Sequence, residues 1–115
     1  MLVQHGDTLT LFTSRGFYGR CTGPYAYRTV YRQAATIAGL ARVAPRRLPF
    51  PAAPRSCGTG NAQVVAAASG GGWRIFWNGR IPQGGDPEGP FRLYTGKVEW
   101  PGGRPAVTKV YRRAR

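Results

Sequence analysis

Acidic side chains are scarce in this sequence: Asp and Glu number four against 17 Lys and Arg, which leaves a net charge of +13 over 115 residues. So few carboxylates exclude an acidic cluster of the kind that binds divalent cations. They also leave the basic residues, which are mostly Arg, without enough internal partners, and a surplus of this size repels itself. The balance of charge therefore favours nucleic acid, or another polyanion, as a partner.

Histidine and cysteine are nearly absent as well, with His5, Cys21 and Cys57 as their representatives. Two cysteines and one distant histidine do not supply the four ligands of a zinc site, and we expect no metal and no cofactor. The cysteines have two interpretations. They form a disulfide, whose closed loop would stabilise the fold by roughly 4 kcal/mol, or they remain reduced, buried thiols.

Long apolar runs are missing too. The longest uninterrupted run covers residues 64–68, far short of the ~20 residues that span a membrane. Residues 1–7 lack the charged and apolar regions of a signal peptide. We therefore expect no membrane partner, and a location inside a cell or in a virion.

Glycine and proline are abundant, at 17 and 10 residues, which approaches the level at which disorder is expected. The chain nevertheless has 42% hydrophobic and 12% aromatic residues, enough to build a packed core. Its length suits one domain. We therefore expect a single small basic domain over residues 1–115.

Alternating apolar and polar residues predict a β-meander in the first third of the chain. Residues 8–13 alternate well, and residues 14–16 contain the glycine that a tight turn needs. Residues 17–22 are expected to return as the second strand of a hairpin. After a Gly-Pro break, residues 25–32 form the third strand.

One helix is predicted over residues 33–43, where apolar residues fall at helical spacing and Pro45 follows. Residues 44–60 hold four prolines and three arginines, and we expect an extended arm rather than a regular element. Residues 111–115 form a basic tail. An arm and a tail of this kind suit a subunit that reaches across its neighbours in an assembly.

The second half of the chain predicts further strands. Residues 61–69 form either a buried strand or a short helix. Residues 73–77 alternate as a strand, and Asn78-Gly79 after them is a strong hairpin signal. Residues 91–100 change the parity of their apolar positions half way along, which predicts a bulge near Gly96.

Residues 105–112 are expected to form the last strand. The expected fold class is mainly β. A small barrel or a meander-type sheet fits, with one short helix near 33–43 and the Pro/Arg-rich arm at 44–60. The order of three strands, a helix and further strands is shared with five-stranded Greek-key barrels of the oligonucleotide-binding type. Fold alone does not determine function, however.

Basic residues recur beside aromatic ones, as in Tyr27-Arg28 and Trp73-Arg74. Neighbouring side chains on a strand point to opposite faces, so one face can pack rings while the other presents arginines. Arginine binds phosphate, and an exposed ring stacks on an unpaired base. The rings that we expect to be mainly structural are Trp73, Trp77, Phe91 and Trp100. The candidate nucleic-acid-binding residues are Tyr18, Arg20, Tyr27, Arg28, Tyr31, Arg32, Arg46, Arg47, Arg74, Arg92, Arg112 and Arg113.

Two residues, His5 and Glu99, are candidates for proton transfer. His5 lies near the N-terminus, where a solvated side chain is the plainer interpretation. Glu99 could serve as the base of a metal-independent ribonuclease, or it could form a cross-strand salt bridge. No Ser-His-acid or Cys-His-acid pattern and no phosphate-cradling loop is present.

Three functions fit these observations. The favoured one is a non-enzymatic structural subunit that binds nucleic acid or another polyanion, and neighbouring protein subunits, within a virion, phage particle or ribonucleoprotein. The first alternative is a small ribonuclease-like toxin or effector. The second is a protein-binding virion or secreted module whose charge is incidental.

Overall fold

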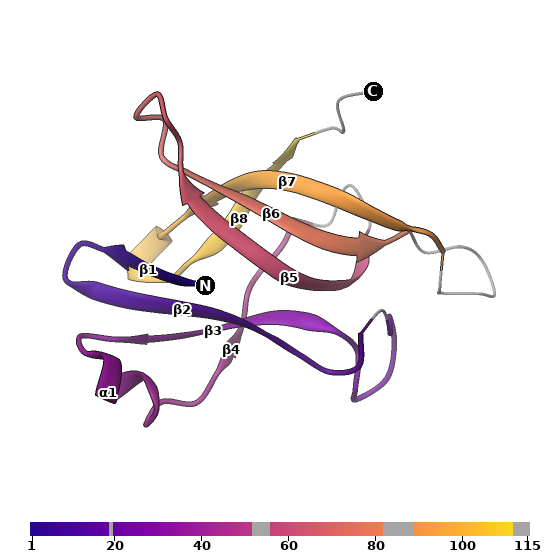
Figure 1. Cartoon of the computed structure of the whole chain (residues 1–115), viewed down its shortest axis with the longest axis horizontal. Coiled ribbons are helices and arrows are strands. Elements are labelled where there is room, and N and C mark those ends of the chain that lie inside the picture. The colour runs from indigo at the N-terminus through magenta and orange to yellow at the C-terminus, as the bar shows by residue number, and fades with distance from the viewer. Residues whose placement is uncertain (19, 52–55, 82–88, 112–115) are drawn as a thin grey trace.

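The protein is mainly β in the computed structural model, which describes residues 1–18, 20–51, 56–81 and 89–111 (Figure 1). The strands in these ranges are β1 (Leu2–His5), β2 (Thr8–Arg15), β3 (Arg28–Ala34), β4 (Arg46–Arg47), β5 (Cys57–Ala66), β6 (Trp73–Arg80), β7 (Phe91–Glu99) and β8 (Ala106–Tyr111). One turn of α-helix, α1 (Ile37–Leu40), and a 3-10 turn, η1 (Pro101–Gly103), accompany them. The predicted fold class, mainly β with one short helix, is confirmed.

The strands join in one sheet in the order β1-β2-β3-β5-β6-β7-β8, with β4 paired to β3. Neighbouring strands run antiparallel except β3 and β5, whose parallel contact pairs Arg28 with Thr59. Figure 1 shows the sheet folding over, so that β5 to β8 form an upper layer and β2 and β3 a lower layer in this view. Within the described residues the ladder ends at β1 and β8. The described strands therefore form an open eight-stranded sheet, and they do not show the closed five-stranded Greek-key barrel considered from the sequence.

The hydrophobic core lies between the two layers. Its buried members are Val3, Phe12, Tyr31, Leu48, Ala62, Val64, Ile75, Trp77, Val98 and Val107. On β6 the alternation predicted from the sequence directs Ile75 and Trp77 into this core, where they are 0% and 1% exposed. Trp73 and Trp100 pack against the edge of the core, as expected for structural rings.

The described residues of the segment 16–27, which are 16–18 and 20–27, form a loop, and this corrects the predicted strand over residues 17–22 and the start of the strand over 25–32. β2 runs to Arg15, and β3 begins only at Arg28. The backbone N–H of Phe17 donates to the carbonyl of Tyr25, and a disulfide joins Cys21 to Cys57 of β5. These links fold the segment back on itself instead of letting it extend along β2.

The helix is shorter than predicted. It covers the single turn Ile37–Leu40 rather than residues 33–43, because Gln33 and Ala34 still pair with β2. Thr36 caps the turn, its Oγ1 accepting a hydrogen bond from the N–H of Gly39 at 3.0 Å. Strand pairing therefore overrides the helical spacing at the start of the segment.

The described residues of the Pro/Arg-rich segment 44–60 pack against the sheet, so the prediction of an extended arm is wrong for them. Arg46 and Arg47 form β4 against β3, Leu48 is 1% exposed, and Cys57 opens β5. Burial of Leu48 is the physical reason, since a fully buried leucine side chain is worth about 2 kcal/mol. Residues 52–55 and most of the predicted basic tail, 112–115, lie outside the described residues.

Asn78-Gly79 does not form the predicted hairpin. β6 continues through both residues to Arg80 and pairs them with Leu93 and Arg92 of β7. Glycine serves packing here instead, because a Cβ on Gly79 would lie 3.1 Å from the ring of Tyr94. Pairing with a distant strand thus outweighs the local turn preference.

Two other expectations are resolved in β5 and β7. Residues 61–69, left open between strand and helix, are strand as far as Ala66. The irregularity predicted near Gly96 falls one step later: Lys97 pairs with Lys109, but Val98 pairs with Val107. The extra residue is therefore on β8 rather than on β7.

Candidate nucleic-acid interface

Two arginines of β6 point away from the core. Trp77 points inward, so alternation along the strand directs Arg74 and Arg80 outward. The guanidinium of Arg74 lies 4.3 Å from the ring centroid of Tyr111, and that of Arg80 lies 4.0 Å from the ring of Phe91. Each arginine is therefore held against an aromatic ring of another strand.

Lysines of β7 and β8 extend the same outer face. Lys97 pairs with Arg74 on one side and with Lys109 on the other, which places three cations in one row across the sheet. Leu93 lies further along β7 toward Phe91 and is 64% exposed. Apolar and basic groups are thus interleaved on this face.

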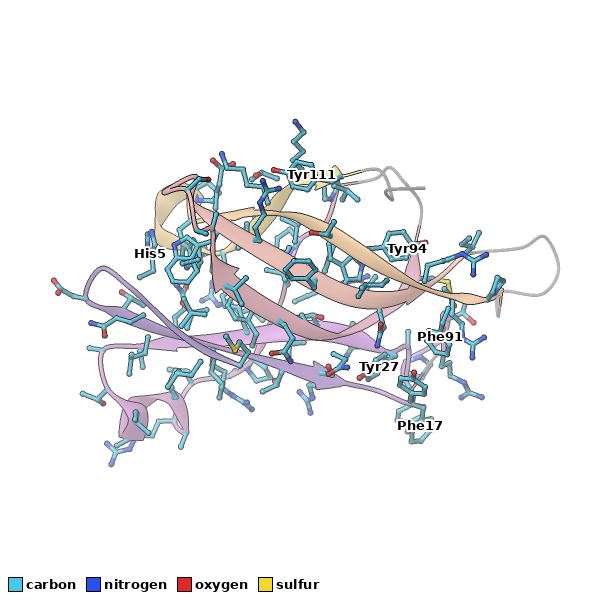
Figure 2. All side chains as sticks on the ribbon, turned by 45° about the horizontal axis from the view of Figure 1, so that its top comes forward. His5, Phe17, Tyr27, Phe91, Tyr94 and Tyr111 are labelled. Carbon is cyan, nitrogen blue, oxygen red and sulfur yellow. A yellow bond between two sulfur atoms is a disulfide. The ribbon has the colours of Figure 1, made fainter. Side chains whose placement is uncertain are left out.

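The loop 16–27 adds a cluster of rings at one end of the sheet. Tyr18 stacks on Phe91 with 4.9 Å between ring centroids and meets Tyr27 edge-on at 5.5 Å. Phe17 stacks on Tyr25 at 5.2 Å. Figure 2 shows Phe17, Tyr27 and Phe91 gathered at this end of the molecule. Because Tyr18 contacts Phe91, the ring cluster and the outer face of the sheet form one continuous surface.

We call this region the aromatic–arginine surface. Its residues are Phe17, Tyr18, Arg20, Tyr25, Tyr27, Arg74, Arg80, Phe91, Lys97, Lys109 and Tyr111. Three of its rings are largely solvent-exposed: Phe17 at 60%, Tyr18 at 65% and Tyr25 at 56%. Rings at this exposure add little to the core and are available to a ligand.

Covalent and steric constraints position the ring cluster. The disulfide holds Cys21 against Cys57, with 4.9 Å between their Cα atoms, so the loop is tied to the first residue of β5. Gly60 on β5 leaves the space that the ring of Tyr27 occupies, since a Cβ there would lie 2.0 Å from that ring. The sequence left the state of the cysteines open, and the structure has them bonded.

A groove of about 700 Å³ borders the cluster, which is within the size range of small-ligand sites. Its lining includes Tyr27, Arg28, Arg47 and Phe50. Nη1 of Arg28 donates to the carbonyl of Ala26 at 3.2 Å, which fixes its guanidinium. The groove therefore offers both a ring and two cationic groups beside the aromatic–arginine surface.

Among the described residues, one cation of this surface, Lys97, is paired with a carboxylate. Among the described residues the ion pair within 4.0 Å is Lys97–Glu99, at 2.6 Å. Arg20, Arg28 and Arg74 make no ion pair within that part of the chain. No carboxylate of the described residues therefore offsets the charge of these three arginines.

Half of the predicted binding residues lie at this surface or in the groove beside it. They are Tyr18, Arg20, Tyr27, Arg28, Arg47 and Arg74. Their convergence could not be predicted from the sequence, since it depends on the parallel contact of β3 with β5 and on the disulfide.

The remaining predicted residues lie elsewhere. Tyr31 belongs to the core at 5% exposure, where it pairs with Phe12 between β3 and β2, so its ring is not available for stacking on a base. Arg92 pairs with Gly79 and has the inward parity of β7, so it does not share the outer face. It lies close to Tyr94. Burial raises the pKa of Tyr94, and the positive charge of Arg92 partly opposes that rise. Arg32 and Arg46 line a separate hollow. Arg112 and Arg113 lie outside the described residues.

Several residues of the surface were not identified from the sequence. Phe17 and Tyr25 fell in segments assigned to strands, and Phe91 was expected to be structural. Phe91 could have been identified from its position, because it lies an even number of residues from Lys97 on β7 and so points to the same outer face. The others missed are Arg80, Lys97, Lys109 and Tyr111.

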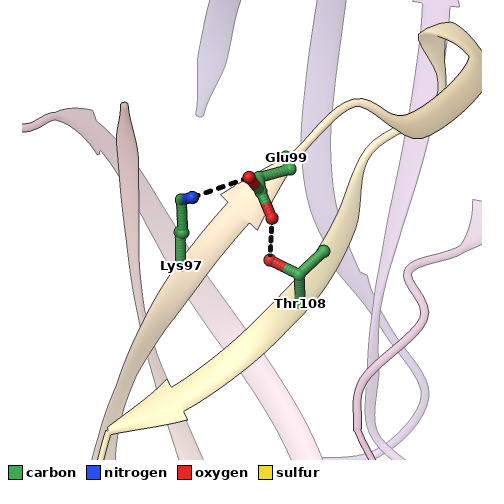
Figure 3. Close-up of polar contacts among 3 residues, drawn as sticks. All are labelled: Lys97, Glu99 and Thr108. Carbon is green, nitrogen blue, oxygen red and sulfur yellow. Dashed lines mark hydrogen bonds and ion pairs between the residues drawn. The ribbon is translucent and has the colours of Figure 1, made fainter. Parts of the chain in front are cut away.

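The two catalytic candidates line one shallow hollow of about 370 Å³ together with Trp73 and Trp100. The ring of His5 stacks on Trp100, with centroids 4.3 Å apart and planes 5° from parallel. Glu99 accepts hydrogen bonds from Lys97 Nζ at 2.6 Å and from Thr108 Oγ1 (Figure 3). These bonds lower the pKa of Glu99, which makes it a poorer general base at neutral pH.

Metal ligands do not converge: no three His, Cys, Asp or Glu side chains within the described ranges are placed to hold an ion together. Over the same part of the chain, no helix has the length and apolar character needed to cross a membrane.

Comparison with known proteins gives no match, whether against protein-family models, curated proteins or solved structures.

Proposed function

We propose that the protein binds single-stranded nucleic acid through the aromatic–arginine surface, as a non-enzymatic structural subunit of a larger assembly. The observation that carries the proposal is the cluster of exposed rings, Phe17, Tyr18 and Tyr25, on one surface with Arg20 and Arg74, for which the described residues supply no carboxylate partner. Proteins that bind single strands combine these two features.

The two kinds of side chain have different tasks in this proposal. Exposed rings stack on unpaired bases, each contributing about 1–3 kcal/mol irrespective of sequence. Arginines and lysines bind the phosphates, and each contact releases a condensed counterion. A duplex hides its bases, so it would use only the cations. The surface therefore favours a single strand.

The test is the affinity of the full chain for an oligothymidylate, measured by fluorescence anisotropy. We expect Tyr18→Ala to weaken binding by about fivefold to a hundredfold, the equivalent of one lost stack. Tyr18→Phe keeps the ring and should bind as the wild type does.

A second pair of variants tests the charge. Arg74→Ala should weaken binding, whereas Arg42→Ala removes the same charge from an exposed position after α1 and should change it little. Equal affinity for duplex and single strand, or no effect of Tyr18→Ala, would contradict the proposal.

Ribonuclease activity is the second candidate, and one observation favours it: His5 and Glu99 line the same hollow. An RNA-cleavage assay with His5→Ala and Glu99→Gln decides it, since cleavage by the wild type that both variants lose would establish catalysis there. We expect no such cleavage, because Glu99 is already bound by Lys97 and Thr108.

A further inference from the structure

A second basic hollow lies on the side of β3 and β4 away from the groove. It has a volume of about 370 Å³. Three arginines line it: Arg32 on β3, Arg46 on β4, and Arg104, which directly follows η1. These positions are far apart in the sequence, and the fold alone brings them together.

Arg32 is held by a hydrogen bond of its side chain, and the other two arginines are placed by their backbone. Nε of Arg32 donates to the carbonyl of Val43 at 3.0 Å, which leaves its four Nη–H groups for a ligand. Pairing opposite Tyr31 fixes the backbone of Arg46 on β4. Nε2 of Gln33 donates to the carbonyl of Gly103 at 2.9 Å and so anchors the turn that carries Arg104.

Among the described residues, no carboxylate lines the hollow; the other lining residues are Tyr31, Gln33, Val43 and Ala44. Three guanidinium groups around one hollow repel one another unless an anion lies between them. Guanidinium forks bind phosphate oxygens with two parallel hydrogen bonds, which suits a tetrahedral anion with several acceptors. We propose that this hollow binds a phosphate group.

The site is independent of the aromatic–arginine surface. Arg46 and Arg47 are neighbours on β4, so their side chains point to opposite sides, and Arg47 lines the groove while Arg46 lines this hollow. The phosphate could belong to a free anion or to the backbone of a nucleic acid. The chemistry is the same, and the experiment separates the two sources.

The experiment titrates pyrophosphate into the full chain by calorimetry at fixed ionic strength, with chloride as the reference anion. We expect Arg46→Ala and Arg104→Ala each to weaken pyrophosphate binding by about tenfold or more. The loss of hydrogen bonds to a charged group lowers affinity by about that factor. Both side chains are exposed, so the variants should fold. Arg15→Ala, an exposed arginine at the end of β2, is the charge-matched control and should bind as the wild type does.

A parallel titration with oligothymidylate identifies the source. If Arg104→Ala weakens both ligands, the site holds a backbone phosphate; if it weakens pyrophosphate alone, the site holds a free anion. Either result supports the site. Pyrophosphate binding no tighter than chloride, or unchanged in Arg46→Ala and Arg104→Ala, would overturn it. Tyr18→Ala should leave pyrophosphate binding unchanged, so failure of the nucleic-acid proposal would be seen separately.

Discussion

At the scale of single residues, Glu99 shows how the protein uses one of its few carboxylates. Its oxygens accept hydrogen bonds from Lys97 on the same strand and from Thr108 on β8. The sequence suggested either a cross-strand salt bridge or a catalytic base. The structure has the ion pair within β7 and the cross-strand contact as a hydroxyl hydrogen bond, so the group links two strands.

These bonds predict a pH dependence. They lower the pKa of Glu99 in the folded state, so the unfolded chain binds the proton more readily. The stability that Glu99 contributes is therefore present above its unfolded pKa and is lost as the pH falls through the folded one. Urea unfolding between pH 3 and about 6 should show a shallower loss of stability for Glu99→Gln than for the wild type.

Asp7→Asn is the control for that series. Asp7 is an exposed carboxylate in the turn between β1 and β2, and its removal should leave the acid-range slope close to that of the wild type. Identical slopes for Glu99→Gln and the wild type would show that the bonds to Lys97 and Thr108 have no role in stability.

At the scale of elements, the pairing of β7 with β8 depends on Gly96. A Cβ at this position would lie 2.5 Å from the carbonyl oxygen of Lys109 and 3.2 Å from the ring of Trp77. The oxygen belongs to the backbone of β8 and cannot rotate away. Gly96→Ala should therefore separate the two strands and destabilise the fold by about 1–3 kcal/mol, as overpacking does.

Urea unfolding of Gly96→Ala and Gly71→Ala measures this effect. Gly71 lies in the exposed turn before β6, where the nearest atom to a new Cβ is the hydroxyl of Ser69 at 3.4 Å. Gly71→Ala should be close to neutral. A Gly96→Ala protein as stable as Gly71→Ala would contradict the close approach of β8.

Element type was predictable where the pattern was local. Alternation identified the strands around residues 8–13 and 73–77, because each has one face on the core. It failed where distant partners decide the conformation: Asn78-Gly79 stays extended because Leu93 and Arg92 pair with it. The loop 16–27 was predicted as strand for a related reason. The disulfide that joins it to β5 depends on Cys57, which is distant in the sequence, so the local pattern does not indicate it.

At the scale of the whole molecule, the disulfide holds the ring cluster to the sheet. Replacing Cys21 and Cys57 with serine should cost roughly 4 kcal/mol of stability on the chain-entropy estimate. Oligonucleotide affinity should also fall, because the loop that carries Tyr18 loses its tie to β5. Urea unfolding measures the loss of stability, and fluorescence anisotropy measures the loss of oligonucleotide affinity.

Wild-type protein in a reducing buffer is the matched condition and should behave as the double variant does. If reduction and the double variant both leave stability and affinity unchanged, the loop is held by its ring contacts alone.

The candidate sites were predictable in composition but not in location. The excess of arginine and the aromatic neighbours pointed to a polyanion. The grouping of Arg32, Arg46 and Arg104, and of Tyr18 with Phe91, depends on a fold that brings separate strands together. Residue types therefore indicated the chemistry, and the topology supplied the geometry.

The salt dependence of oligothymidylate binding tests the central claim most directly. If the aromatic–arginine surface neutralises four or more phosphates, a plot of log K against log salt concentration should be linear with a slope of about −3 or steeper, since each contact on a single strand contributes ~0.7. Arg74→Ala should reduce that slope, whereas Tyr18→Phe should not. A flat plot would contradict the claim that this surface binds nucleic acid.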